Sequence, residues 1–90
     1  MKKILITGAS SGFGKSLVNE LSKDYFVIAV SRRLKKMKNI FRKKKNIEFH
    51  KVDLANEKDL LKFIKKIQKK HKYIPYIVNN AGIFLKYKIK

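Results

Sequence analysis

The apolar residues of this 90-residue chain change their spacing several times along its length. Residues 3–6 form a short, almost wholly apolar run, which predicts a strand that is buried on both faces. Residues 25–30 form a second such run, rich in β-branched and aromatic side chains. Residues 47–52 and 76–79 predict a third and a fourth strand. Pro75 stands at the start of the last one, where its missing N–H does least harm.

Between these runs, the apolar residues recur at the intervals of an amphipathic helix. Helices are predicted over residues 13–22, 34–44 and 56–72. In the third helix, Asn56 is the expected N-cap, and Asp59 is a capping-box-like partner three residues later. The apolar stripes of the three helices consist of Phe13, Leu17 and Leu21, of Leu34, Met37, Ile40 and Phe41, and of Leu60, Phe63, Ile64 and Ile67.

Strands that alternate with helices predict an α/β fold, here β-α-β-α-β-α-β, with a parallel sheet and right-handed crossovers. A Rossmann-type arrangement places such strands in the order 3-2-1-4. The chain is shorter than a typical domain of about 100–150 residues, and no linker divides it. We therefore expect one partial Rossmann-type domain over residues 1–90.

The charge of the chain is strongly positive, with 24 basic against 6 acidic residues and a formal net charge of +18. Such a balance is typical of proteins that bind nucleic acid or anionic membranes. However, 21 of the basic residues are Lys and 3 are Arg, whereas phosphate and base recognition favours Arg. Lys, Ile and Asn are all abundant, which suggests a bias in coding composition. Nucleic-acid binding through the lysine-rich helices therefore remains an alternative that we do not favour.

The sequence offers little for several other classes of site. Cys is absent, which excludes disulfides, thiolate catalysis and cysteine zinc sites. His50 and His71 are the only histidines, so we expect no metal site. The apolar run at residues 4–6 is too short for a signal peptide, and no stretch approaches the roughly 20 apolar residues of a membrane span. We therefore expect a cytoplasmic protein without a membrane partner.

The stretch TGASSGFG, between the first predicted strand and the first helix, is the sharpest local feature. Gly8 allows a sharp turn off the strand, Gly12 allows the backbone to approach a pyrophosphate, and Gly14 allows the helix to pack closely. The N–H groups and the dipole at the helix start then bind phosphates. Ser10 and Ser11 add hydroxyl donors. A plain turn rich in small residues is the alternative.

This glycine spacing resembles the TGxxxGxG fingerprint of the short-chain dehydrogenase/reductase family, with Phe13 where the family usually has Ile. Residues 79–82 (NNAG) are similar to a family motif that braces the central sheet and helps to form the cofactor cleft. Asp53 and Leu54 follow the third strand, where an Asp of the family contacts the adenine ring. Taken alone, Asp53 is equally consistent with a helix N-cap, and the two asparagines with a turn.

The residues after the second strand bear on the choice of cofactor. An NAD-selective site has an acidic residue there, which binds the ribose hydroxyls. Here Ser31, Arg32 and Arg33 follow, and no Asp or Glu occurs between Asp24 and Glu48. Because Arg can bind a phosphate through two hydrogen bonds, we expect NADP(H) to be favoured over NAD(H). The alternative is that both arginines are ordinary surface charges.

The resemblance implies an NAD(P)(H)-dependent oxidoreductase that transfers hydride between the nicotinamide and a carbonyl or alcohol. The cofactor-binding residues that it implies are Gly8, Ser10, Ser11, Gly12, Phe13, Gly14, Ser31, Arg32, Arg33, Asp53, Leu54, Asn80, Ala81 and Gly82. The family's catalytic Ser and Tyr-x-x-x-Lys lie downstream of NNAG, and no Tyr-x-x-x-Lys occurs in this chain.

We therefore expect the chain to be a truncated, cofactor-binding half that is inactive alone. Under this reading, the small-molecule substrate site and the family's oligomer interface belong to the missing half. A free-standing nucleotide-binding or regulatory fragment is the alternative.

Overall fold

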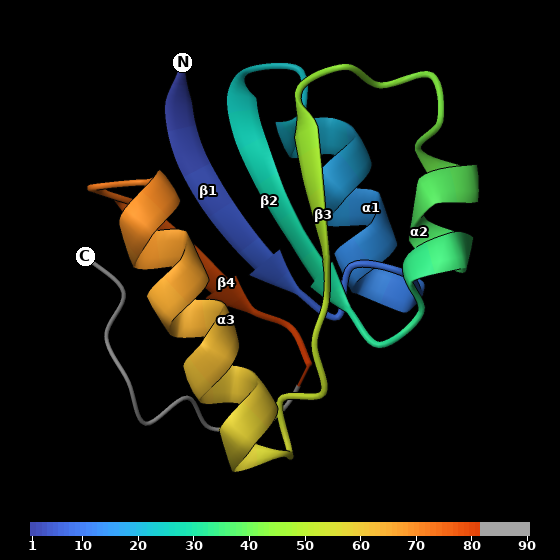
Figure 1. Ribbon diagram of the computed structural model, residues 1–90. Helices are drawn as coiled ribbons and strands as arrows, with labels where there is room; N and C mark the ends of the chain where they lie inside the picture. The colour runs from blue at the N-terminus through green and yellow to red at the C-terminus, as the bar shows by residue number, and fades with distance from the viewer. Residues whose placement is uncertain (82–90) are drawn as a thin grey trace.

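The computed structural model describes residues 1–81, which form a four-stranded sheet with helices on both faces (Figure 1). The elements in chain order are β1 (Lys2–Thr7), α1 (Gly12–Leu21), β2 (Tyr25–Ser31), α2 (Leu34–Ile40), β3 (Ile47–Lys51), α3 (Glu57–Lys70) and β4 (Tyr76–Asn79). Every strand pair is parallel, and the strand order is β3-β2-β1-β4. The predicted Rossmann-type order is therefore confirmed.

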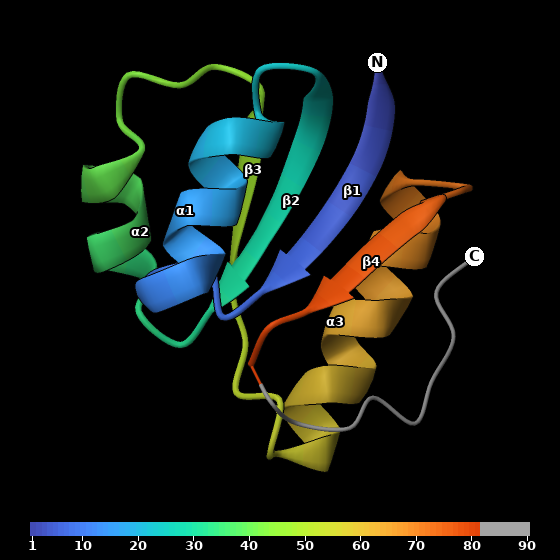
Figure 2. The ribbon, with the colours of Figure 1, turned by 180° about the vertical axis from the view of Figure 1, so that it is seen from behind.

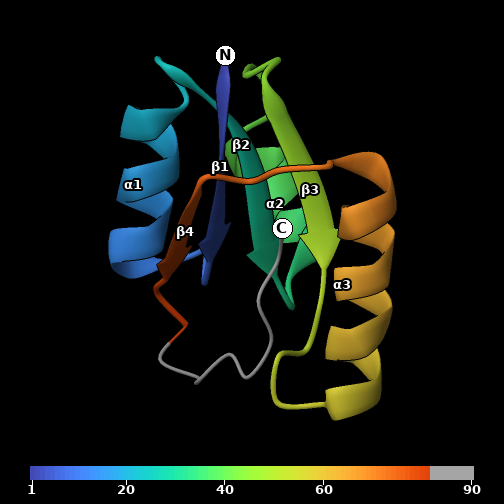
Figure 3. The ribbon, with the colours of Figure 1, turned by 90° about the vertical axis from the view of Figure 1, so that its left-hand side faces the viewer.

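The two faces of the sheet carry separate hydrophobic cores. Figure 2 shows α1 and α2 in front of the sheet, and Figure 3 shows α1 and α3 on its opposite sides. Along β1, Ile4 and Ile6 pack with α1 and α2, whereas Leu5 packs with α3. Because both faces are covered, the successive residues 4–7 of β1 are all buried, which explains the continuous apolar run in the sequence.

The helix α3 agrees best with the sequence prediction. The side chain of Asn56 accepts a hydrogen bond from the main-chain N–H of Asp59 at 3.1 Å, as an N-cap does. Its buried stripe consists of the four predicted residues, Leu60, Phe63, Ile64 and Ile67. At 14 residues, α3 is too short and too charged to cross a bilayer. No helix within residues 1–81 is long and apolar enough to do so.

The helix predicted over residues 34–44 is shorter in the structure and ends at Ile40. Phe41 turns inward and stacks on Phe49 of β3, with ring centroids 6.4 Å apart. A longer helix would also bring the four consecutive basic residues 42–45 onto its last turn. Like charges at helical spacing destabilise a helix, so both effects favour an early end.

The predicted role of Phe13 in the apolar stripe of α1 is wrong, because this side chain is 68% exposed. The residues that α1 buries are Gly14 and Val18, four positions apart. This spacing defines the face that packs on the sheet. Leu17 and Leu21, at the same spacing as Phe13, are half-buried against the core on this face, so the predicted stripe fails at its first residue, in the first turn of α1.

Candidate functional site

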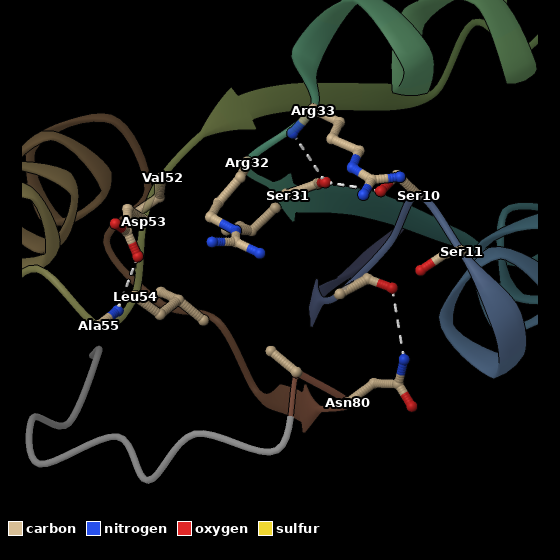
Figure 4. Close-up of a pocket in the computed structure, with 13 residues that line it drawn as sticks. Ser10, Ser11, Ser31, Arg32, Arg33, Val52, Asp53, Leu54, Ala55 and Asn80 are labelled. Carbon is tan, nitrogen blue, oxygen red and sulfur yellow. Dashed lines mark hydrogen bonds between the residues drawn. The ribbon is translucent and has the colours of Figure 1, made fainter.

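The carboxyl ends of the four parallel strands surround a cleft of about 380 Å³ (Figure 4). Its walls come from the loop after β1, the turn after β2, the segment after β3 and the end of β4. This is the edge of an open parallel sheet at which ligands bind. The residues that line it are Gly8, Ser10, Ser11, Val30, Ser31, Arg32, Arg33, Val52, Asp53, Leu54, Ala55, Asn80 and Ala81.

Most of the predicted site residues therefore line one cleft, although they come from four separate segments of the chain. Gly12, Phe13 and Gly14 do not line it, and Gly82 lies outside the described residues. The lining residues that the sequence prediction missed are Val30, Val52 and Ala55. Each of these adjoins a predicted site residue in the sequence, and that adjacency was the only available signal.

The loop after β1 has the conformation that its glycines predict. Gly8 has a φ of +63° and Gly12 a φ of +54°, and both values disfavour residues with a side chain. A Cβ added at Gly12 would have no atom within 4 Å, so its outer face is open. The main-chain N–H of Ala9 donates to the carbonyl of Val30 at 3.1 Å, which fastens the loop to β2.

Hydrogen bonds join this loop to the end of β4. The buried hydroxyl of Thr7 donates to the side-chain oxygen of Asn79 at 3.0 Å and accepts from the N–H of Ala81 at 3.1 Å. The side-chain amide of Asn80 donates to the carbonyl of Gly8 at 3.3 Å. The first and the last sequence motif are therefore one hydrogen-bonded unit. Thr7 is a member of this unit that the sequence prediction had not placed in the site.

The turn after β2 brings two arginines to the cleft. Arg32 and Arg33 both line it, and within residues 1–81 neither guanidinium has a hydrogen bond or an ion pair. The hydroxyl of Ser31 lies 2.7 Å from that of Ser10, and it accepts a hydrogen bond from the main-chain N–H of Arg33 at 3.0 Å. Figure 4 shows both contacts at the edge of the cleft.

The segment after β3 holds Asp53 in a fixed position. Its carboxylate accepts a hydrogen bond from the N–H of Ala55 at 3.1 Å. Its own N–H donates to the carboxylate of Asp59 at 2.7 Å. The predicted capping box is therefore not reciprocal. The N–H of Asp59 donates to the side chain of Asn56, but the carboxylate of Asp59 accepts from the N–H of Asp53 and not from that of Asn56. Since Asn56 caps α3, Asp53 is not the N-cap of that helix.

An ionic cluster joins β3 to the end of α3, outside the lining of the cleft. Burial raises the pKa of Glu48, but hydrogen bonds from Lys70, His50 and His71 outweigh this effect and lower the pKa to about 2. The shortest contacts of its carboxylate are 2.6 Å to Nε2 of His50 and 2.7 Å to Nζ of Lys70. The cluster therefore contributes to the attachment of α3 to the sheet.

The sequence model of the short chain dehydrogenase family matches residues 2–90. The chain belongs to the short-chain dehydrogenase/reductase family. Within this family, it is 41% identical over 85 residues to 3-amino-tetrahydro-pyrrolizinone reductase of Xenorhabdus hominickii. That match covers 91% of this chain but 29% of the relative, so this short-chain dehydrogenase chain spans less than a third of the relative's length.

Solved structures of short-chain dehydrogenases share the fold. A variant of ElxO with NADPH bound is 37% identical, with a TM-score of 0.77, over 96% of this chain and 37% of the other. A metagenomic short-chain oxidoreductase in complex with NADP is 25% identical, with a TM-score of 0.82, over 91% and 39% of the two chains. The fold is also shared by 4-hydroxyisoleucine dehydrogenase complexed with NADH, which is 23% identical, with a TM-score of 0.82. That match covers 92% of this chain and 35% of the other.

Proposed function

We propose that this chain binds a nicotinamide dinucleotide in the cleft at the carboxyl ends of its strands and prefers NADP(H) to NAD(H). The observation that carries the proposal is the presence of Arg32 and Arg33 in the same cleft as the glycine-rich loop. Guanidinium groups that have no partner among residues 1–81 are ready to bind an added phosphate, and the turn contains no carboxylate that would repel it. Similar structures hold either NADP(H) or NADH, so the preference rests on these arginines.

The diphosphate and the adenine of the cofactor each have matching groups in the cleft. The main-chain N–H groups between Gly8 and Gly12, with the positive end of the α1 dipole, suit the diphosphate. The open face of Gly12 leaves room for it to approach. Asp53 uses one carboxylate oxygen on Ala55, and its second oxygen can accept a hydrogen bond from the amino group of adenine.

The whole protein is proposed to be an oxidoreductase that acts on a carbonyl or an alcohol. The bound cofactor supplies or accepts the hydride, and the cleft holds and orients it. No Tyr-x-x-x-Lys pattern occurs in residues 1–90, so no proton donor of the family's usual kind is present in them. We therefore propose that these 90 residues bind the cofactor without turning over a substrate.

The proposal is tested by titrating the chain and two double variants with NADPH and NADH in a calorimeter. Arg32→Ala/Arg33→Ala should weaken NADPH binding by at least about tenfold and change NADH binding little, because a charged hydrogen bond contributes about 1.5–3 kcal/mol. Lys35→Ala/Lys36→Ala removes the same charge from exposed residues of α2 outside the cleft lining. Equal losses of NADPH affinity in both double variants would contradict the predicted preference.

A further inference from the structure

The hydroxyl group of Ser31 is largely buried in the wall of the cleft, next to the turn that carries the two arginines. Ser31 is the last residue of β2 and is 7% exposed, and Ser10 opposite is 5% exposed. Their hydroxyl oxygens are 2.7 Å apart. The same Ser31 oxygen accepts the main-chain N–H of Arg33 at 3.0 Å. One buried oxygen therefore contacts both the glycine-rich loop and the arginine turn.

These contacts use most of the hydrogen-bonding capacity of Ser31. A serine hydroxyl has one proton to donate and two lone pairs that accept. The N–H of Arg33 occupies one lone pair, and Ser10 occupies either the proton or the second lone pair. Whichever serine is the donor, two of the three positions on Ser31 are used within the protein. When Ser31 is the donor, its one proton is used on Ser10 and none is left for a phosphate oxygen, and the residue is only 7% exposed.

The main chain at Val30 and Ser31 is hydrogen-bonded to the glycine-rich loop and to the segment after β3. The carbonyl of Val30 accepts from Ala9, and the carbonyl of Ser31 accepts from Val52, both at 3.1 Å. The chain leaves the sheet directly afterwards, through Arg32 and Arg33, where α2 begins without a side-chain cap. The hydrogen bond from the Arg33 N–H to the Ser31 hydroxyl therefore sets the direction in which the turn leaves the strand.

We propose that Ser31 is a positioning residue for cofactor selectivity. Its hydroxyl holds the turn that carries Arg32 and Arg33 against the glycine-rich loop at Ser10, so that both guanidiniums face the cleft. This inference rests on the proposed function, and it replaces direct cofactor binding by Ser31, which the family resemblance implies, with a positioning role. The two roles differ in what they predict once the arginines have been removed.

The test is a double-mutant cycle in the 90-residue chain, read as the ratio of the NADH to the NADPH dissociation constant. Ser31→Ala should lower this ratio about tenfold, because a hydrogen bond that positions a charged group is lost. Ser31→Thr keeps the hydroxyl and should keep the ratio. In the Arg32→Ala/Arg33→Ala background, Ser31→Ala should change the ratio less than about twofold, because Ser31 acts through these two arginines.

Two results would overturn the positioning role. One is an unchanged ratio in Ser31→Ala. The other is an equally large loss with and without the two arginines, which is expected if the hydroxyl binds the phosphate directly. If Ser31→Ala does not fold, the same cycle with Ser10→Ala breaks the contact from the other side, and the same outcomes decide.

The failure of this inference is distinguishable from the failure of the proposed function. A wild-type chain that binds neither dinucleotide contradicts both the proposed function and the positioning role. A wild-type chain that prefers NADPH, with Ser31→Ala showing the same preference, contradicts the positioning role alone.

Discussion

Gly14, in the first turn of α1, packs directly on the main chain of Gly8. A Cβ added at Gly14 would lie 2.0 Å from the carbonyl oxygen of Gly8 and 2.5 Å from the side-chain nitrogen of Asn80. The helix therefore begins in contact with the turn that follows β1. This close approach depends on the absence of a side chain at Gly14.

Replacement of Gly14 should therefore be far more harmful than replacement of Gly12. Gly14→Ala forces backbone to move, and we expect it to lower the free energy of unfolding by about 2–4 kcal/mol and to abolish NADPH binding. Gly12→Ala meets no atom within 4 Å and is opposed by its positive φ alone, at a cost of about 1–2 kcal/mol. Urea unfolding of both variants checks the difference. Equal losses of stability would show that the close contact at Gly14 is not the cause.

Asp59 should affect cofactor binding although it does not line the cleft. Asp59→Ala removes the acceptor of the Asp53 N–H, so the main chain that carries the Asp53 carboxylate is held less firmly. We expect an affinity loss of about three- to tenfold for NADPH, in line with the net contribution of one ordinary hydrogen bond, about 0.5–1.5 kcal/mol. Asp59→Asn keeps an acceptor oxygen and should lose less. If both variants bind equally weakly, the charge of Asp59 matters rather than the hydrogen bond.

The free energy of unfolding should depend on pH through the carboxylate of Glu48. Its pKa is lowered from 4.5 to about 2 in the folded chain, so the unfolded chain binds a proton first as the pH falls. The stabilisation is therefore complete above about pH 4.5 and is lost toward pH 2, and it amounts to about 2–3 kcal/mol. Denaturant unfolding across this range measures the loss.

Matched variants separate this effect from general acid unfolding. Glu48→Gln should be less stable at neutral pH and should show a flatter pH dependence below pH 4.5. Glu20→Gln removes an exposed carboxylate paired with Lys23, which contributes about 0–1 kcal/mol, and should leave the profile nearly unchanged. A Glu48→Gln profile parallel to that of the wild-type chain would contradict the assignment.

The sheet order and the cleft were predictable because they depend on features that are local in the sequence. Strands buried on both faces give continuous apolar runs, and their carboxyl ends necessarily meet at one edge. Gly8 and Asp53 therefore both line the cleft, as their places after β1 and β3 predict. Their conformation and position follow from the strand that precedes each of them.

The hydrogen bonds that organise the cleft were not predictable in the same way. The contact of Ser10 with Ser31 and that of Thr7 with Asn79 join residues that are far apart in the chain. Their partners are set by how the strand ends are staggered in space. The early end of α2 and the exposure of Phe13 have a similar origin, because packing on the sheet overrides local periodicity.

The location of the bound cofactor tests the central claim most directly. The chain carries a charge of +18, so any anion can associate loosely with its lysines. NADPH titrated into the isotope-labelled chain at about 0.15 M salt, where exposed charges are screened, should shift the amide resonances of residues 8–14, 31–33 and 80–81 in nuclear magnetic resonance spectra. Shifts confined to the lysine-rich surface of α3, or no shifts at millimolar NADPH, would contradict a dinucleotide site in this cleft.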